Sequence, residues 1–279
     1  ALLLMLLFYS GFSVAVWGFA GAKSRLVDSL ITLFYMSNWA RALGIHAPNE
    51  LGHTWSLSIE EQFYAIWPPL LLVLLRKAPT RLTIALIALA LAVSAWMLRW
   101  YLGMAGATTT RLFNGLDTRA DALMIGCMLG ILLSSNLIPR KAEGAMSRIL
   151  SIASVVSLSV LVGIAFIEHW WDPVMYYWLL FVVELLTAIL IFDCFTNPPS
   201  IVRIIVSFQP LVWIGVISYG LYLWHYPIFT LMREAGYDWK QIITAGTLLT
   251  FVIAILSYFL LERPFLKLKK RLEFRPDHL

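Results

Sequence analysis

The sequence is poor in charge and almost free of cysteine. Only 13% of its 279 residues are charged and 60% are hydrophobic, whereas roughly a quarter of the residues of an ordinary soluble domain are charged. This composition excludes a water-soluble globular domain. The two cysteines, Cys127 and Cys194, lie in apolar segments with no cysteine or histidine at a ligand spacing. The sequence therefore predicts neither a disulfide framework nor a metal site.

The apolar residues form runs of about 20 residues, each long enough to cross ~30 Å of hydrocarbon as a helix. We predict an all-α, polytopic transmembrane helical bundle that forms a single membrane domain over residues 1–279. The eight expected spans are residues 1–20, 62–75, 82–102, 117–135, 149–167, 174–195, 211–232 and 241–261. Residues 27–41 contain an apolar run too short to cross, and we expect a helix there that lies in the interface or is tucked into the domain.

The net charge of +5 comes from Lys and Arg gathered in short loops. Because these residues do not line one polar face, they indicate membrane topology and no nucleic-acid partner. Loops 76–81 and 140–148 and the basic tail 263–279 are predicted to be cytoplasmic. The segments 23–61, 103–116, 168–172 and 233–240 are then expected on the outer face.

One segment, residues 53–68, combines polar and ionisable residues with apolar ones and reads HTWSLSIEEQFYAIWP. Its candidate active-site or acceptor-side residues are His53, Trp55, Ser56, Glu60 and Tyr64. In a helix, Glu60 and Tyr64 lie one turn apart on one face, while the neighbouring acid points elsewhere. A carboxylate at the membrane boundary costs free energy unless it is paired, so it is suited to carrying protons. The alternative is an interfacial cap solvated by lipid headgroups.

Charged residues also begin the fourth expected span. Arg119 and Asp121 are two positions apart and cannot face each other on a helix, so each needs another partner. Arg99 or Arg111 can pair with an aspartate, and Glu60 can pair with Arg119. A structural ion-pair network and contact with substrate are both compatible with these residues.

Two further candidates lie within later spans. Tyr222 and His225 share one helical face at a spacing of three residues, which suits either a general base or a hydrogen-bonded contact between helices. Glu184 is the deepest acid and is a functional candidate for that reason. Its alternative role is a protonated side chain bonded to a neighbouring helix.

Four ordered blocks carry a resemblance to a known family. They are YMSNW at residues 35–39 with WSLSIEEQFY at 55–64, TRADALMIGCMLG at 118–130, ISYGLYLWHYP at 217–227 and LERP at 261–264. With these blocks the chain resembles the acyltransferase family 3 membrane proteins. The resemblance implies a ten-span domain in the bacterial cytoplasmic membrane, surrounded by lipid and without a bound cofactor. It also implies transfer of an acyl group, typically acetyl, from cytoplasmic acyl-CoA to a hydroxyl of an exported glycan or lipid-linked saccharide.

The family's basic and histidine motifs of its first two spans have no counterpart in this sequence. The eight expected spans therefore correspond to the family's last eight, and we expect the catalytic histidine to lie outside this chain. By itself the chain is expected to insert into a membrane without transferring acyl groups. A transporter and an inactive remnant of the family remain as alternatives. The acceptor, the acyl chain length and the oligomeric state do not follow from the sequence.

Overall fold

The computed structural model describes residues 1–167, 172–196 and 200–272, and these contain helices and no strand. The helices belong to two compact units. The first unit comprises Ala1–Ser37, His46–Thr54 and Gln209–Leu279, and the second comprises Asn38–Ile45 and Trp55–Phe208. Each unit has its own core and its own polar cluster. The single domain over residues 1–279 stays a prediction.

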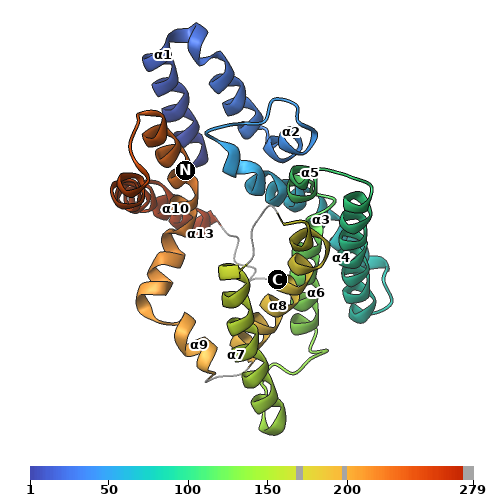
Figure 1. The fold of residues 1–279 in the computed structure, drawn as a ribbon. Coiled ribbons are helices and arrows are strands. Elements are labelled where there is room, and N and C mark those ends of the chain that lie inside the picture. Colours follow the sequence, from blue (N-terminus) through green and yellow to red (C-terminus); the bar gives the residue numbers. More distant parts are fainter. Residues whose placement is uncertain (168–171, 197–199, 273–279) are drawn as a thin grey trace. The chain divides into compact units, whose positions relative to one another are not determined.

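The first unit begins with a helical hairpin. Helix α1 runs over Leu2–Leu33 but is interrupted at Gly18, whose φ of 67° and ψ of 173° are non-helical. Glycine tolerates this conformation because it has no Cβ to clash with the backbone. The chain reverses there, as Figure 1 shows for the blue helix, and Ser10 Oγ donates to Ser29 Oγ across the two arms at 2.9 Å. Residues 23–33, expected in an outer loop, are the second arm of this hairpin.

Within the described residues, the remaining helices of the first unit are one short helix before residue 55 and six from the last third of the chain. They are the short helix η1 (Gly52–Thr54), α10 (Gln209–Glu234), α11 (Trp239–Gln241), η3 (Ile242–Gly246), α12 (Thr247–Ser257), η4 (Tyr258–Glu262) and α13 (Arg263–Leu272). Helices α10 and α12 approach closely at Gly220, where an added Cβ would lie 3.2 Å from the Cα of Ala254. This close packing fixes the helix that carries Tyr222 and His225.

The second unit is built around alanine-rich α4. Its helices are α2 (Ser37–Leu43), α3 (Trp55–Lys77), α4 (Arg81–Met104), α5 (Thr109–Asn114), α6 (Ala120–Ser134), α7 (Gly144–Ile167), η2 (Met175–Leu179), α8 (Leu180–Thr196) and α9 (Ile201–Val206). Ala88 and Ala92 of α4 are fully buried and form a core with Phe63, Trp67 and Met124. Small side chains on α4 allow α6 to pack closely against it.

Every expected span coincides with a helix. Within the described residues, five helices are long and apolar enough to cross a membrane, at Leu2–Leu33, Arg81–Met104, Gly144–Ile167, Met175–Thr196 and Trp239–Lys269. The multi-pass helical architecture is thereby confirmed. The other three expected spans fall on α3, on α10 and on α6, which has only 15 residues.

Two predicted segments, residues 27–41 and 168–172, have different outcomes. The helix expected over residues 27–41 is broken after Leu33, where Tyr35 has a φ of 53°, and a separate helix starts at Ser37. A positive φ at a non-glycine residue does not occur inside a helix, so the helix ends there. The expected outer loop 168–172 lies mostly outside the described residues.

Candidate functional site

His53 is a buried polar side chain of the first unit. It lies on η1, is 6% exposed, and its Nε2 is 3.1 Å from the carbonyl oxygen of Leu223 on α10. The hydroxyl of Tyr222 donates to the backbone oxygen of His53. These two contacts tie η1 to α10 over a sequence separation of about 170 residues. His53, two residues before the WSLSIEEQFY block, therefore meets residues of the ISYGLYLWHYP block.

Around His53 the aromatic rings of α10 form a cluster. Its ring centroid lies 5.4 Å from that of Tyr222, 5.5 Å from that of His225 and 5.1 Å from that of Tyr226. His225 Nδ1 is 2.7 Å from the carbonyl oxygen of Tyr222. A carbonyl only accepts, so this Nδ1 carries the proton and Nε2 of His225 keeps its lone pair.

The same reasoning assigns the tautomer of His53. Its Nε2 donates to a carbonyl, so Nδ1 holds a lone pair, and no donor among the described residues reaches that buried atom. Burial, helped by the nearby His225, lowers the pKa of His53 to about 3. His53 is therefore neutral at physiological pH.

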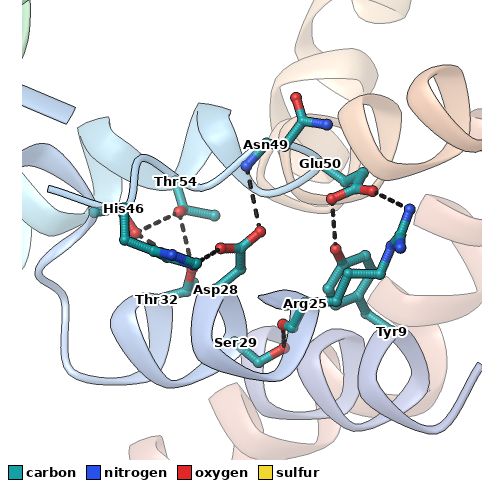
Figure 2. Close-up of polar contacts among 10 residues, drawn as sticks. Tyr9, Arg25, Asp28, Ser29, Thr32, His46, Asn49, Glu50 and Thr54 are labelled. Atoms are coloured by element: carbon teal, nitrogen blue, oxygen red, sulfur yellow. Dashed lines mark hydrogen bonds and ion pairs between the residues drawn. The ribbon is translucent and has the colours of Figure 1, made fainter. Parts of the chain in front are cut away.

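The segment that carries His53 is anchored to the second arm of α1. Figure 2 shows Asp28 between two partners: His46 Nε2 lies 2.8 Å from one carboxylate oxygen, and the backbone N–H of Asn49 lies 3.3 Å from the other. At the end of η1, the hydroxyl of Thr54 lies 3.2 Å from that of Thr32. Residues 46–54 are thus held at both ends.

A third anchor is Glu50, which is only 2% exposed. Tyr9 Oη donates to one of its oxygens at 2.8 Å, and Arg25 Nη2 pairs with the other at 2.8 Å (Figure 2). The same Arg25 nitrogen is 3.2 Å from Glu234 at the end of α10. Burial opposes ionisation of Glu50, but the Tyr9 hydrogen bond and the Arg25 charge hold its pKa below the ordinary value. Arg25 thereby joins the hairpin, the His53 segment and α10.

The candidates on α3 belong to the second unit. Trp55 packs on Phe113 with ring centroids 4.5 Å apart, and Tyr64 is 56% exposed. Glu60 and Glu61 are both exposed, and no ion pair joins Glu60 to Arg119 in the described structure. The suggested Glu60–Arg119 pair is wrong, because one side chain faces outward while the other has its guanidinium shielded. Ser56 is the second residue of this helix.

Gln62 is a partly buried polar residue of α3 that bonds to α2. Its Oε1 accepts from Trp39 Nε1 at 3.2 Å, and its Nε2 donates to Asn38 at 2.9 Å. These contacts connect the YMSNW block to the WSLSIEEQFY block within one unit. The sequence analysis did not single out Gln62.

A buried charge network lies on α4, α6 and α8. Arg99 Nη1 pairs with Asp121 at 2.5 Å, and both side chains are completely buried. Arg99 also donates to the backbone oxygens of Tyr176 and Thr118 at 2.8 and 2.6 Å. A separate pair, Arg111 with Asp117, is partly exposed. Both arginines that the sequence offered as partners thus pair with an aspartate.

Arg119 and Glu184 complete this network. Glu184 on α8 interacts electrostatically with Asp121, Arg99 and Arg119. Arg119 and Asp121 belong to one family-like block, whereas Glu184 belongs to none. The fold brings all three together within the second unit.

Comparison with known proteins identifies the family of this chain. The model of acyltransferase family 3, described as an acyltransferase domain, matches residues 1–262. The chain belongs to this family. It is 37% identical over 266 residues to the peptidoglycan O-acetyltransferase OatA of Listeria monocytogenes, covering 88% of this chain and 41% of that protein. The putative peptidoglycan O-acetyltransferase YrhL of Bacillus subtilis is 34% identical over 274 residues, with 91% and 42% covered.

A more distant relative is the O-acetyltransferase OatA of Staphylococcus aureus, 28% identical over 249 residues, with 86% of this chain and 41% of that protein covered. The chain thus spans about two fifths of the length of these curated relatives. No solved structure matches it significantly. Membership of the family agrees with the resemblance drawn from the four sequence blocks.

Several residues of this acyltransferase-family site were missed by sequence reasoning. Tyr9, Arg25, Asp28, Glu50 and Glu234 were not singled out, although Arg25 and Asp28 stand directly before the apolar run at residues 30–35. An ionisable residue next to or inside an apolar helix needs a buried partner. That signal could have identified Arg25 and Asp28, but nothing in the sequence indicates which distant carboxylate Arg25 binds.

Proposed function

We propose that the chain is the membrane part of an O-acyltransferase of the bacterial cytoplasmic membrane. It transfers an acetyl group from cytoplasmic acyl-CoA to a hydroxyl of an exported, cell-surface glycan. Family membership and the printed activities of the relatives support the acyl transfer and the glycan acceptor. The CoA donor is our own extension, drawn from the chemistry that the family resemblance implies.

The observation that carries the proposal for this chain is the cluster of His53, Tyr222 and His225. Acyl transfer to an alcohol needs a lone pair that receives the hydroxyl proton as the oxygen attacks the acyl carbon. Nε2 of His225 holds such a lone pair, since Nδ1 donates to the backbone. His53 stays neutral beside it, and the Tyr222 hydroxyl fixes η1 against α10. We assign this cluster to the acceptor side of the reaction.

Trp55, Ser56, Glu60 and Tyr64 stay candidates for contact with the acceptor, and Glu184 for a role within the membrane. Arg119 and Asp121 stay candidates both for structural pairing and for contact with substrate. A transporter has no specific support from the described residues, and the family match weighs against it.

The test is acetyl transfer in membranes that contain the chain. Membranes are incubated with radiolabelled acetyl-CoA and a purified glycan, and alkali-labile acetate on the glycan is counted. The chain is tested by itself and together with the first two membrane spans of a family member. We expect transfer in the second arrangement and a loss of about 10²-fold or more in His225→Ala, because the acceptor hydroxyl would lose its contact with the lone pair of Nε2.

His225→Ala is compared with Tyr226→Phe, which changes a neighbouring aromatic side chain of the same helix and leaves the imidazole in place. Equal activity of His225→Ala and the unchanged chain would remove His225 from the reaction. Absence of transfer with every donor thioester and glycan tested, in both arrangements, would refute the proposed function.

A further inference from the structure

A cavity of about 260 Å³ lies between α6 and α8 in the second unit. Ile125, Leu129 and Leu180 line it with apolar atoms, and Gly126 leaves space where a side chain would otherwise stand. Two charged residues, Arg119 and Glu184, also line it. The cavity is therefore largely apolar with a charged region on its wall.

The hydrogen-bonding capacity of these two residues is not satisfied. Nη1 of Arg119 has no acceptor, and neither oxygen of Glu184 receives a hydrogen bond from a donor in the part of the chain that the structure describes. All three atoms are shielded from solvent. Buried donors and acceptors without partners are costly, so a ligand that supplies both partners would bind favourably.

The local charge limits what such a ligand can be. Arg99 and Arg119 contribute two positive charges, and Asp121 and Glu184 are the two acids that face them. A neutral ligand adds no charge to this network, whereas an ion would add a buried charge that has no partner of its own.

We propose that this cavity binds a secondary amide that carries a small alkyl group. The amide oxygen accepts from Arg119, the amide N–H donates to Glu184, and the alkyl group packs on the apolar wall. Water alone does not fit this description, because the cavity is several times the ~30 Å³ of one water molecule and its wall is mostly apolar. A hydrocarbon chain leaves both polar groups unsatisfied.

The inference bears on the proposed function through the source of the amide. An N-acetylated sugar of a glycan acceptor carries one, and the pantetheine arm of an acyl-CoA donor carries two. Only this choice of source rests on the proposed function. Binding of an amide in the cavity can be measured without any turnover.

The experiment is calorimetric titration of the chain in detergent micelles with N-acetylglucosamine and, separately, with pantetheine. Glucose and cysteamine, which lack a secondary amide, are the control probes. We expect saturable binding of one amide probe, which identifies the source, and none of the controls. Lack of binding by both amides, or equal binding of an amide and its control, would overturn the proposal.

Two variants locate the bound probe. Gly126 lines the cavity, so Gly126→Leu fills it, whereas Gly130 lies on the same helix and does not line the cavity. An added Cβ meets no atom within 4 Å at either position, so Gly130→Leu is a matched control. We expect at least a tenfold weaker Kd in the first and no change in the second. Glu184→Leu should weaken binding on the order of tenfold, since it removes the buried hydrogen-bond acceptor.

Thermal unfolding of each variant shows whether it is folded. If folded Gly126→Leu and Glu184→Leu both bind as tightly as the unchanged chain, the amide lies elsewhere and the assignment fails. Amide binding without acetyl transfer would instead contradict only the proposed function.

Discussion

The buried pair of Arg99 and Asp121 makes a sharp prediction about stability. Both side chains are fully buried and joined at 2.5 Å, whereas Arg111 and Asp117 are joined at the same distance with side chains 20% and 36% exposed. Removing one member of a buried pair leaves an uncompensated charge and costs about 3–5 kcal/mol. Removing one member of an exposed pair costs about 0–1 kcal/mol.

We therefore expect Asp121→Leu to be far more destabilising than Asp117→Leu. For a unit of this size, 1 kcal/mol corresponds to a shift of about 2–4 °C, so the buried change should lower the Tm by roughly 6–20 °C. The exposed change should lower it by at most a few degrees. Thermal unfolding in detergent, followed by circular dichroism, measures both.

The double variant Arg99→Met with Asp121→Leu separates charge from packing. Replacing both partners of a buried pair by apolar side chains is often neutral or stabilising, although here it also removes the hydrogen bonds of Arg99 to Tyr176 and Thr118. We expect the double variant to be more stable than Asp121→Leu. Equal losses in Asp117→Leu and Asp121→Leu, or a double variant less stable than the single one, would refute the reasoning.

Four further predictions follow from particular residues. The pKa of His53 in the folded state is about 3, below the ordinary 6.5. The neutral side chain therefore stabilises the fold above pH 6.5, and this stabilisation is lost as the pH falls toward 3. His53→Gln should flatten that part of a Tm–pH curve. Gly18→Val should destabilise the hairpin by at least about 1 kcal/mol, measured by thermal unfolding, since Gly18 has a φ of 67°. In a background with Cys127 and Cys194 replaced, Lys77→Cys should react with a maleimide only from the cytoplasmic side, and labelling from outside would contradict the topology. Glu60→Gln should reduce acetyl transfer more than Glu61→Gln with equal membrane insertion, and equal activities would remove the distinction between the two acids.

The fold class could be predicted because it depends on composition and run length alone. Apolar runs of about 20 residues leave a helix as the only open structure that satisfies its backbone in a bilayer. The hairpin in α1 could not be predicted in this way. Gly18 stands in an apolar run that also suits a continuous helix, and only the contact of Ser10 with Ser29 shows that the second arm folds back. Long-range pairing of this kind leaves no local signal.

In the candidate site, too, the residues that could be predicted are those with a local sequence signal. Spacing on one helix identified Tyr222 and His225, and the polar residues gathered in segment 53–68 identified His53, because both signals are local in sequence. The pairing of Arg25 with Glu50 and Glu234 spans 25 and 209 residues and has no local signal. Sequence reasoning could require a partner for such a charge, but only the fold names it.

These anchors explain why the polar residues of the first unit act together. Residues 46–54 contain only three residues in a regular helix, so their backbone is not held by a helical ladder. Their position depends instead on Asp28, on Glu50 and on the hydroxyl contact of Thr54 with Thr32. A change at any anchor therefore displaces His53 relative to His225, whose own helix is fixed by packing at Gly220. Variants of Glu50 should for this reason reduce acetyl transfer by misplacing His53, even though the Glu50 side chain bonds Tyr9 and Arg25 and makes no contact with either histidine ring among the described interactions.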